Sequence, residues 1–196
     1  MFRSIKLLAL AGLFLATHAN AALITLETAS VDGSFNESDL AGYFSTVEST
    51  TTTELDNFTM VNLADNKIHK LTIEFDQNFD SMVDMFFGLD AGHGAEVFVN
   101  GTNVFDTESN LWWSFNWQNA SVISLQDVAL ATGLNTIELY FAEDCCSGAS
   151  SIEFNDGRGL QALTVANIQA AEVPAPATLG LFGLVLAGAV LRRRTR

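Results

Sequence analysis

The chain has few positive charges, and this scarcity limits its partners. Nine Lys and Arg residues stand against 23 Asp and Glu, and residues 22–172 hold all of the acids but only three of the cations. That segment therefore has a net charge of about −20 at neutral pH, which would repel nucleic acid and anionic membranes. We expect no nucleic-acid partner, and a polyanionic glycan is disfavoured as a ligand.

Recognisable catalytic sets are also lacking. Two histidines, His69 and His93, follow the first 21 residues, and there is no Gly-x-Ser-x-Gly elbow and no phosphate-binding glycine loop beside a lysine. A glycosidase needs only two carboxylates, so the many acids leave that enzyme class open. We expect a protein that is not an enzyme, with no catalytic residues and no bound metal.

Proline is absent from residues 22–172, and the apolar residues there recur mostly at every second position. The alternation is clearest in His69–Phe75, Val83–Leu89 and Thr136–Ala142, and it is typical of half-buried strands in an antiparallel sheet. Asn100-Gly101 separates two further apolar runs and is the pair that best suits a type I′ hairpin turn. These features predict an all-β domain over residues 22–172, a single antiparallel β-sandwich or jelly roll.

Weaker patterns predict the remaining elements. Further strands are expected at Leu23–Glu27, Phe58–Leu63, Leu111–Trp117, Ser121–Leu125, Ser151–Asn155 and Leu160–Ile168. Ser45–Glu54 is expected to be a loop, and Ser38–Phe44 a helical turn capped by Ser38.

The two ends of the chain differ from this domain. Arg3 and Lys6 precede the apolar run Leu7–Ala16, and the small residues of Ala19-Asn20-Ala21 follow, so residues 1–21 are predicted to form a helical signal peptide that is removed before Ala22. A buried first helix is the alternative.

The other end, residues 173–196, contains a second apolar segment. Ala177–Leu191 is apolar throughout and is followed by an arginine cluster that should remain in the cytoplasm. The run is shorter than the roughly 17–25 residues of a normal spanning helix. We therefore expect a C-terminal hydrophobic helix that anchors the chain transiently in the inner membrane.

An aromatic run, residues 111–117, offers a candidate ligand surface. If it is a strand, Trp113, Phe115 and Trp117 share one face and Trp112 lies on the other. Large aromatic residues usually fill sandwich interiors, but exposed ones stack on sugar rings. The Trp113 face fits the core better, and Trp112 is the candidate glycan-binding residue.

Cys145 and Cys146 are the two cysteines of the chain, and they are adjacent. Neighbouring Cα atoms lie about 3.8 Å apart, whereas most disulfides need about 4.4–6.8 Å, so a disulfide between them would be strained. Intermolecular pairing and a buried pair of free thiols are the alternatives. A metal site is poorly supported, because adjacent thiolates lack the usual ligand spacing.

The C-terminal segment resembles the PEP-CTERM family of sorting signals. The order of Val173, Pro174, Ala175 and Pro176, the apolar run, and then Arg192, Arg193 and Arg194 is similar to that family, although Ala175 occupies the usual Glu position. The resemblance implies that an exosortase cuts near the proline element and directs the protein to the cell surface or matrix. Cys145-Cys146-Ser147-Gly148 also matches the CCXG subgroup of PEP-CTERM proteins.

A looser resemblance covers residues 85–154. The hairpin around Asn100-Gly101, the segment Val128–Asn135 and the run Leu139–Glu143 are similar in order and spacing to fibro-slime and protective-antigen-type β-sandwiches. Some members of that group bind sugar through calcium held by a pair of Asp residues. Here the corresponding position reads Asp90-Ala91, so the resemblance implies a glycan site at Asp90, whereas one of the two Asp residues that would hold calcium is absent.

Together these features predict a non-enzymatic, exported surface or extracellular-matrix protein that is sorted by an exosortase and associated with exopolysaccharide in biofilm. A lectin-like carbohydrate-binding module is the alternative, followed by a glycan-active enzyme.

Overall fold

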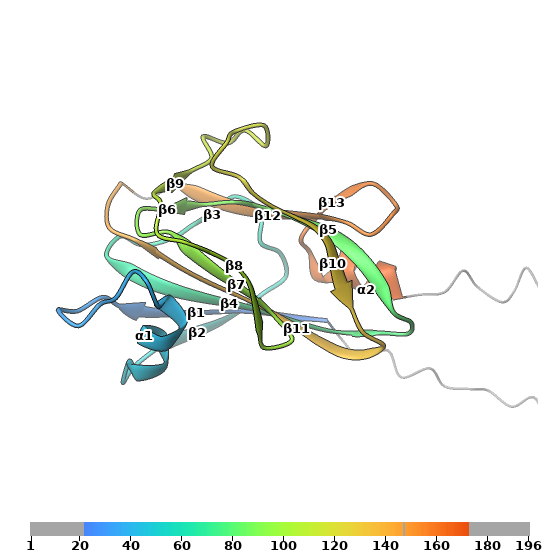
Figure 1. Cartoon of the computed structure of the whole chain (residues 1–196), viewed down its shortest axis with the longest axis horizontal. Helices are drawn as coiled ribbons and strands as arrows, with labels where there is room; N and C mark the ends of the chain where they lie inside the picture. The colour runs from blue at the N-terminus through green and yellow to red at the C-terminus, as the bar shows by residue number, and fades with distance from the viewer. Residues whose placement is uncertain (1–21, 147, 173–196) are drawn as a thin grey trace, which may run out of the picture.

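The alternating segments form two antiparallel sheets that pack face to face (Figure 1). The structure is a computed structural model, and it describes residues 22–146 and 148–172. The first sheet has the order β2 (Thr51–Leu55), β1 (Leu23–Ser30), β4 (Lys67–Gln77), β11 (Gly133–Glu143), β7 (Ala95–Val99) and β8 (Thr102–Thr107). The second has the order β10 (Ile123–Leu130), β5 (Ser81–Gly88), β12 (Ala149–Asn155) and β13 (Leu160–Ala162), with β3 (Val61–Asn62) paired to β12. The predicted all-β sandwich is confirmed.

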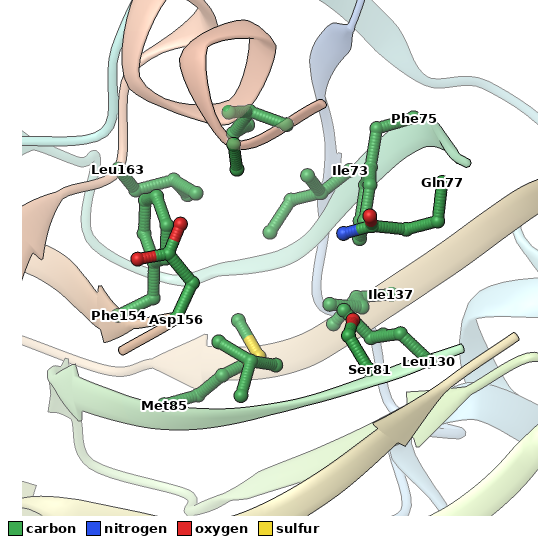
Figure 2. A pocket seen from close by; sticks show the side chains of 13 residues that line it. Ile73, Phe75, Gln77, Ser81, Met85, Leu130, Ile137, Phe154, Asp156 and Leu163 are labelled. Atoms are coloured by element: carbon green, nitrogen blue, oxygen red, sulfur yellow. The ribbon is translucent and has the colours of Figure 1, made fainter. Parts of the chain in front are cut away.

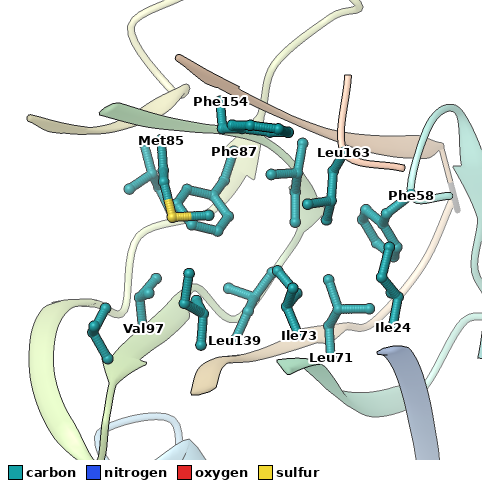
Figure 3. Packing of buried hydrophobic residues seen from close by; sticks show 14 of the residues in the cluster. Ile24, Phe58, Leu71, Ile73, Met85, Phe87, Val97, Leu139, Phe154 and Leu163 are labelled. Atoms are coloured by element: carbon teal, nitrogen blue, oxygen red, sulfur yellow. The ribbon is translucent and has the colours of Figure 1, made fainter. Parts of the chain in front are cut away.

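The core lies between the sheets and is built from the inward-facing residues of each strand. Leu71 and Ile73 of β4 meet Leu139 of β11 within the first sheet, and Phe87 and Phe154 face them from the second (Figure 3). His69 shares the inward face of β4, where it is buried beside Phe141 with a ring-centroid distance of 5.1 Å.

The predicted hairpin is also confirmed. Asn100 and Gly101 join β7 to β8 with φ angles of 50° and 77°, so both central residues have the positive φ of a type I′ turn.

Helix α1 (Leu40–Thr46) packs on the outer face of the first sheet, where Tyr43 and Phe44 cover Tyr140 (Figure 1). Its N-cap is Asp39, which accepts a hydrogen bond from the Gly42 amide at 2.8 Å, so the prediction of Ser38 as the cap was wrong. Ser38, the residue before the cap, instead donates its hydroxyl to the side-chain oxygen of Asn36.

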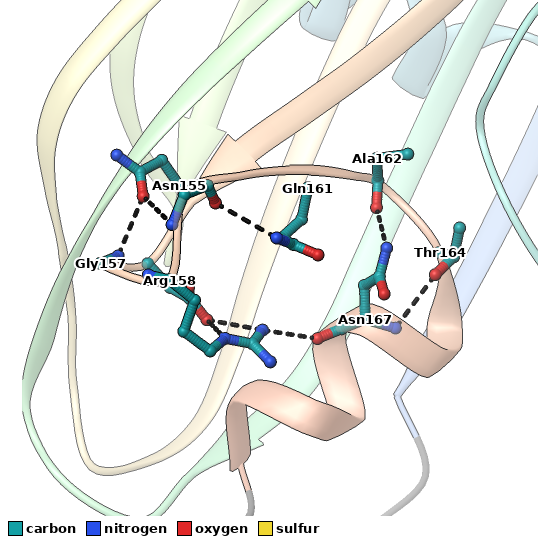
Figure 4. Close-up of polar contacts among 9 residues, drawn as sticks. Asn155, Gly157, Arg158, Gln161, Ala162, Thr164 and Asn167 are labelled. Carbon is teal, nitrogen blue, oxygen red and sulfur yellow. Dashed lines mark hydrogen bonds and ion pairs between the residues drawn. The ribbon is translucent and has the colours of Figure 1, made fainter.

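Helix α2 (Val165–Glu172) ends the described chain and corrects the predicted strand Leu160–Ile168. The hydroxyl of Thr164 accepts the Asn167 amide at 3.0 Å and thereby caps the helix after a short β13. Asn167 also donates its side-chain amide to the Ala162 carbonyl, and its own carbonyl accepts from Arg158 (Figure 4). These contacts fix α2 against the β12–β13 turn.

Other predicted boundaries were also wrong, among them that of Ser121–Leu125, which the structure extends to Leu130 in β10. Ser45–Glu54 contains most of β2, a threonine-rich edge strand that is exposed on both faces and so lacks alternation. Phe58–Leu63 contributes only β3, because Phe58 is buried in a connection whose amide bonds to the Leu163 carbonyl. Leu111–Trp117 ends its strand at Trp112, because Ser114 and Phe115 both have a φ of 55°.

Within residues 22–146 and 148–172, neither helix is long and apolar enough to cross a membrane. The predicted signal helix and C-terminal hydrophobic helix lie outside the described residues.

Candidate functional site

A short two-stranded ribbon at one end of the sandwich brings two of the predicted site residues together. Strand β6 (Asp90–Ala91) pairs with β9 (Leu111–Trp112), and Asp90 lies opposite Trp112 in the register. The Asp90 amide also donates to the Ser150 hydroxyl of β12 at 3.1 Å. Segments that are far apart in the sequence therefore meet at this corner.

Gly148 is the point at which these side chains meet. Its amide donates a hydrogen bond to the Asp90 carboxylate. A Cβ atom at Gly148 would overlap the indole of Trp112 and would lie 2.8 Å from the Asp90 Oδ2 atom. The position is therefore restricted to glycine by the close approach of both partners.

Glu143 holds the start of the loop between β11 and β12 through hydrogen bonds to its backbone. It continues the inward-facing series of β11 and is 4% exposed, and its carboxylate accepts three backbone amides. Oε2 accepts from Gly92 at 2.9 Å, and Oε1 accepts from Asp144 and Cys145, each at 3.0 Å. The carboxylate thus ties the end of β11 to the turn after β6.

Burial raises the pKa values of both carboxyl groups of this corner. For Asp90 the Gly148 amide opposes the effect of burial, and the negative charges of Asp65 and Asp144 add to it. For Glu143 the Cys145 amide opposes burial, and the charge of Asp90 adds to it. The carboxylates of Asp65 and Asp144 near Asp90, and that of Asp90 near Glu143, place negative charge at this corner, which disfavours an anionic ligand.

Trp112 provides the exposed surface of the corner. The side chain is 39% exposed, and its ring lies 5.1 Å from that of Phe115 in an edge-to-face arrangement. Trp113 is buried as predicted, and its indole nitrogen donates to the Ala149 carbonyl at 2.8 Å. The predicted shared face of one strand does not exist, however, since the chain turns at residues 114 and 115 and leaves Phe115 51% exposed.

Cys145 and Cys146 lie in the loop beside this corner, with both thiols free and exposed. Cys146 has a φ of 68°, in the left-handed region. A hydrogen bond to the Cys146 thiol raises the pKa of the Cys145 thiol to about 11. The exposure is inconsistent with a buried thiol pair, while pairing after export stays a prediction.

The residues present do not fit a calcium site. Ala91 supplies no carboxylate next to Asp90, and one Asp90 oxygen already accepts the Gly148 amide. Both oxygens of Glu143 are occupied by amides, and no group of three or more His, Cys, Asp or Glu in the described part of the chain has a metal-binding arrangement. What the corner offers is a flat apolar face beside a hydrogen-bond acceptor.

Sequence reasoning missed Glu143 and Phe115. The sequence did contain a signal for Glu143. It follows Leu139 and Phe141 at every second position, so a strand places this acid on an otherwise apolar face of β11. Phe115 had none, because its exposure depends on a local turn with positive φ that strand alternation does not reveal.

A separate cavity of ≈ 40 Å³ lies at the opposite end of the sandwich, beneath α2 (Figure 2). Its lining is mainly apolar, including Ile73, Phe75 and Leu163, with Gln77, Ser81 and Asp156 at its margin. The volume is far below the roughly 300–1,000 Å³ of typical small-molecule sites. We regard it as a packing defect in the core.

The predicted sorting residues Val173, Pro174, Ala175, Pro176, Arg192, Arg193 and Arg194 lie outside the described residues. Comparison with protein families does cover them, because residues 172–194 match the PEP-CTERM protein-sorting motif. No curated protein matches the chain.

Solved structures share the fold of the sandwich. The PA14 sugar-binding domain from an RTX adhesin matches with a TM-score of 0.52 and 13% identity, over 74% of this chain and 96% of that one. The PA14 domain of the antifreeze protein MpAFP matches with a TM-score of 0.49 and 13% identity, over 74% of this chain and 87% of that one. An anti-sigma factor domain-containing protein matches with a TM-score of 0.50 and 9% identity, over 76% of this chain and 48% of that one. At these identities the likeness shows the fold alone.

The first of these structures confirms that the domain resembles protective-antigen-type sandwiches. The C-terminal match implies export and exosortase sorting to the cell surface. The chain is thus an exported protein that carries a PEP-CTERM sorting motif behind a PA14-like β-sandwich.

Proposed function

We propose that the protein is a non-enzymatic carbohydrate-binding module of the cell surface or extracellular matrix, and that it binds neutral glycan at the corner formed by Asp90 and Trp112. The observation that carries the proposal is the position of Trp112 directly opposite Asp90, with its indole 39% exposed. An indole face stacks on the apolar face of a sugar ring, and an adjacent carboxylate accepts hydrogen bonds from its hydroxyl groups. The PA14 domain of the RTX adhesin, described as sugar-binding, has the same fold and supports the idea.

The charge of the protein narrows the ligand class. Burial raises the pKa of Asp90, and the negative charges of Asp65 and Asp144 add to this shift, so negative charge is already concentrated at the corner. An acidic polysaccharide would add to that charge. Neutral exopolysaccharide of the biofilm matrix is therefore the proposed partner.

The binding test is a glycan array probed with the purified exported protein, once with calcium and once with a chelator. We expect binding to neutral glycans under both conditions. Trp112→Ala and Asp90→Asn should each weaken it about tenfold or more. Phe79→Ala is the matched control, because Phe79 is 53% exposed and lies in the β4–β5 turn at the opposite end of the sandwich. Absence of binding under both conditions would overturn the proposal, as would binding that neither site variant changes.

The proposal that the protein is not an enzyme follows from the position of the carboxyl groups. Glu143, the nearest partner for Asp90, is buried and holds three backbone amides, so it has no free oxygen directed at a ligand. Incubation with the bound glycan should leave its chain length unchanged. The appearance of new reducing ends would contradict this point.

The location is tested by removing residues 173–196 and fractionating the cells. The intact protein should reach the surface or matrix with a reduced mass after processing. The shortened chain should be exported without being sorted to the same fraction. Identical mass and location for both proteins would exclude sorting by the tail.

A further inference from the structure

A second hollow lies next to the proposed site, on the outer face of the second sheet. It has a volume of ≈ 230 Å³. It is lined by residues of the β12–β13 pair and of two loops: Thr59, Met60, Trp113, Phe115, Trp117, Ser151, Ile152, Glu153 and Ala162. Ile152 and Phe154 belong to the core, so Glu153 between them points to the outer face. We call this hollow the outer groove.

The outer groove is continuous with the Asp90–Trp112 corner through aromatic rings. Phe115 lies 5.1 Å from Trp112 and 5.7 Å from Trp113, measured between ring centroids. Trp113 in turn lies 4.7 Å from Trp117. Trp112, Phe115 and Trp117 reach the surface, and the buried Trp113 connects Phe115 to Trp117 beneath them.

The turn that presents Phe115 is conformationally costly. Ser114 and Phe115 are consecutive non-glycine residues with a φ of 55°, and the Asn116 amide closes the turn on the Trp113 carbonyl at 3.0 Å. Glycine would adopt these angles without the steric penalty. The chain instead holds a large aromatic ring in a disfavoured conformation and leaves half of it in water, a combination that is typical of ligand-binding segments.

The lining of the outer groove fits a neutral sugar. Flat aromatic rings supply stacking surface, while the Thr59 hydroxyl and the Glu153 carboxylate supply polar groups, and burial raises the pKa of Glu153. Among the described residues that line the hollow there is no Lys, Arg or His to pair with an anionic group. The volume lies below the roughly 300–1,000 Å³ of sites for drug-sized ligands, which suits one ring of a chain.

We infer that the outer groove is a second sugar subsite. The protein would then bind several successive sugar rings of an extended neutral polysaccharide instead of a single terminal sugar. The inference rests on the proposed function, since the Asp90–Trp112 corner supplies the neighbouring subsite. One chain would pass from Trp112 over Phe115 toward Trp117.

The test compares ligands of different length. The probes are glucose, mannose and galactose, each as the monosaccharide and as its β-1,4-linked hexasaccharide, titrated calorimetrically into the purified exported protein. We expect at least one hexasaccharide to bind tenfold or more tightly than its monosaccharide. Phe115→Ala and Phe115→Leu should both remove this gain, because leucine keeps apolar volume but lacks a flat ring. Phe79→Ala, at the other end of the sandwich and equally exposed, should keep the gain.

The outcomes separate the two proposals. Equal affinity for both lengths, or a length gain that survives both Phe115 variants, overturns the extended subsite and leaves the Asp90–Trp112 site intact. Both proposals are supported if Trp112→Ala loses monosaccharide binding and if the Phe115 variants lose the tighter binding of the hexasaccharide. Absence of binding to all six probes overturns both.

Discussion

Trp112 and Asp90 lie opposite one another across the β6–β9 ribbon, and both side chains close over the Cα atom of Gly148. This relationship gives a steric reason for the glycine in Cys145-Cys146-x-Gly148. The glycine lets the loop after β11 pass beneath the indole while its amide binds the carboxylate. The short motif is therefore a structural part of the proposed glycan site.

Gly148→Ala should weaken both the fold and glycan binding, because the added methyl group overlaps Trp112 and Asp90. We expect a loss of about 1–3 kcal/mol in the free energy of unfolding, measured by denaturant titration. Gly33→Ala is the matched control, since nothing lies within 4 Å of a Cβ at Gly33. Equal stability of the two variants would show that the loop is not closely packed.

Glu143→Gln should destabilise the loop without removing much volume. The glutamine amide group would direct its own N–H donors at the amides of Gly92, Asp144 or Cys145, so at least one donor loses its acceptor. The expected cost is about 1–3 kcal/mol of unfolding free energy. Glu54→Gln, on the exposed edge strand β2, should change it little. A Glu143→Gln variant as stable as the wild type would refute the structural role of this carboxylate.

His69 should make the protein less stable in mild acid. Burial lowers its pKa to about 4 in the folded chain from 6.5 when unfolded, so the unfolded state takes up the proton first as the pH falls. Stability is full above pH 6.5 and declines below it, with a loss of about 2 kcal/mol at pH 5 from this group. His69→Gln should remove that component, measured as the difference in unfolding free energy between pH 8 and pH 5. An unchanged difference would contradict the assignment.

The adjacent cysteines are predicted to pair with each other after export. Alkylation of the denatured, exported protein without reductant should add no label, and prior reduction should allow two. Denaturation is needed because the pKa of Cys145, raised to about 11 by the Cys146 thiol, would slow labelling of the folded chain. Two labels without reductant would show free thiols, and a doubled mass would show intermolecular pairing.

Sequence patterns predicted the sandwich because its long strands bury one face each. The alternation in β4, β5 and β11 and the Asn100-Gly101 turn are local, and they needed no knowledge of tertiary contacts. The candidate site was predicted only as separate residues. Asp90 and Trp112 come together on strands of two residues each, which are too short to show periodicity and form only because the surrounding loops hold them.

The aromatic run, residues 111–117, also shows what periodicity in the sequence could not predict. Trp112 was correctly separated from the buried Trp113, but Phe115 was assigned to the wrong surface because period-two alternation assumes extended backbone. Two consecutive residues with positive φ break that assumption at Ser114. The threonine-rich β2 was missed for the opposite reason, because a strand exposed on both faces has no alternation to detect.

The most direct test of the account is a crystal structure of the exported protein with the neutral hexasaccharide that binds best. We predict one sugar ring stacked on Trp112 with a hydroxyl group bonded to the Asp90 carboxylate, and the next rings crossing Phe115 toward Trp117. A sugar bound away from Trp112 and Asp90 would contradict the proposed site.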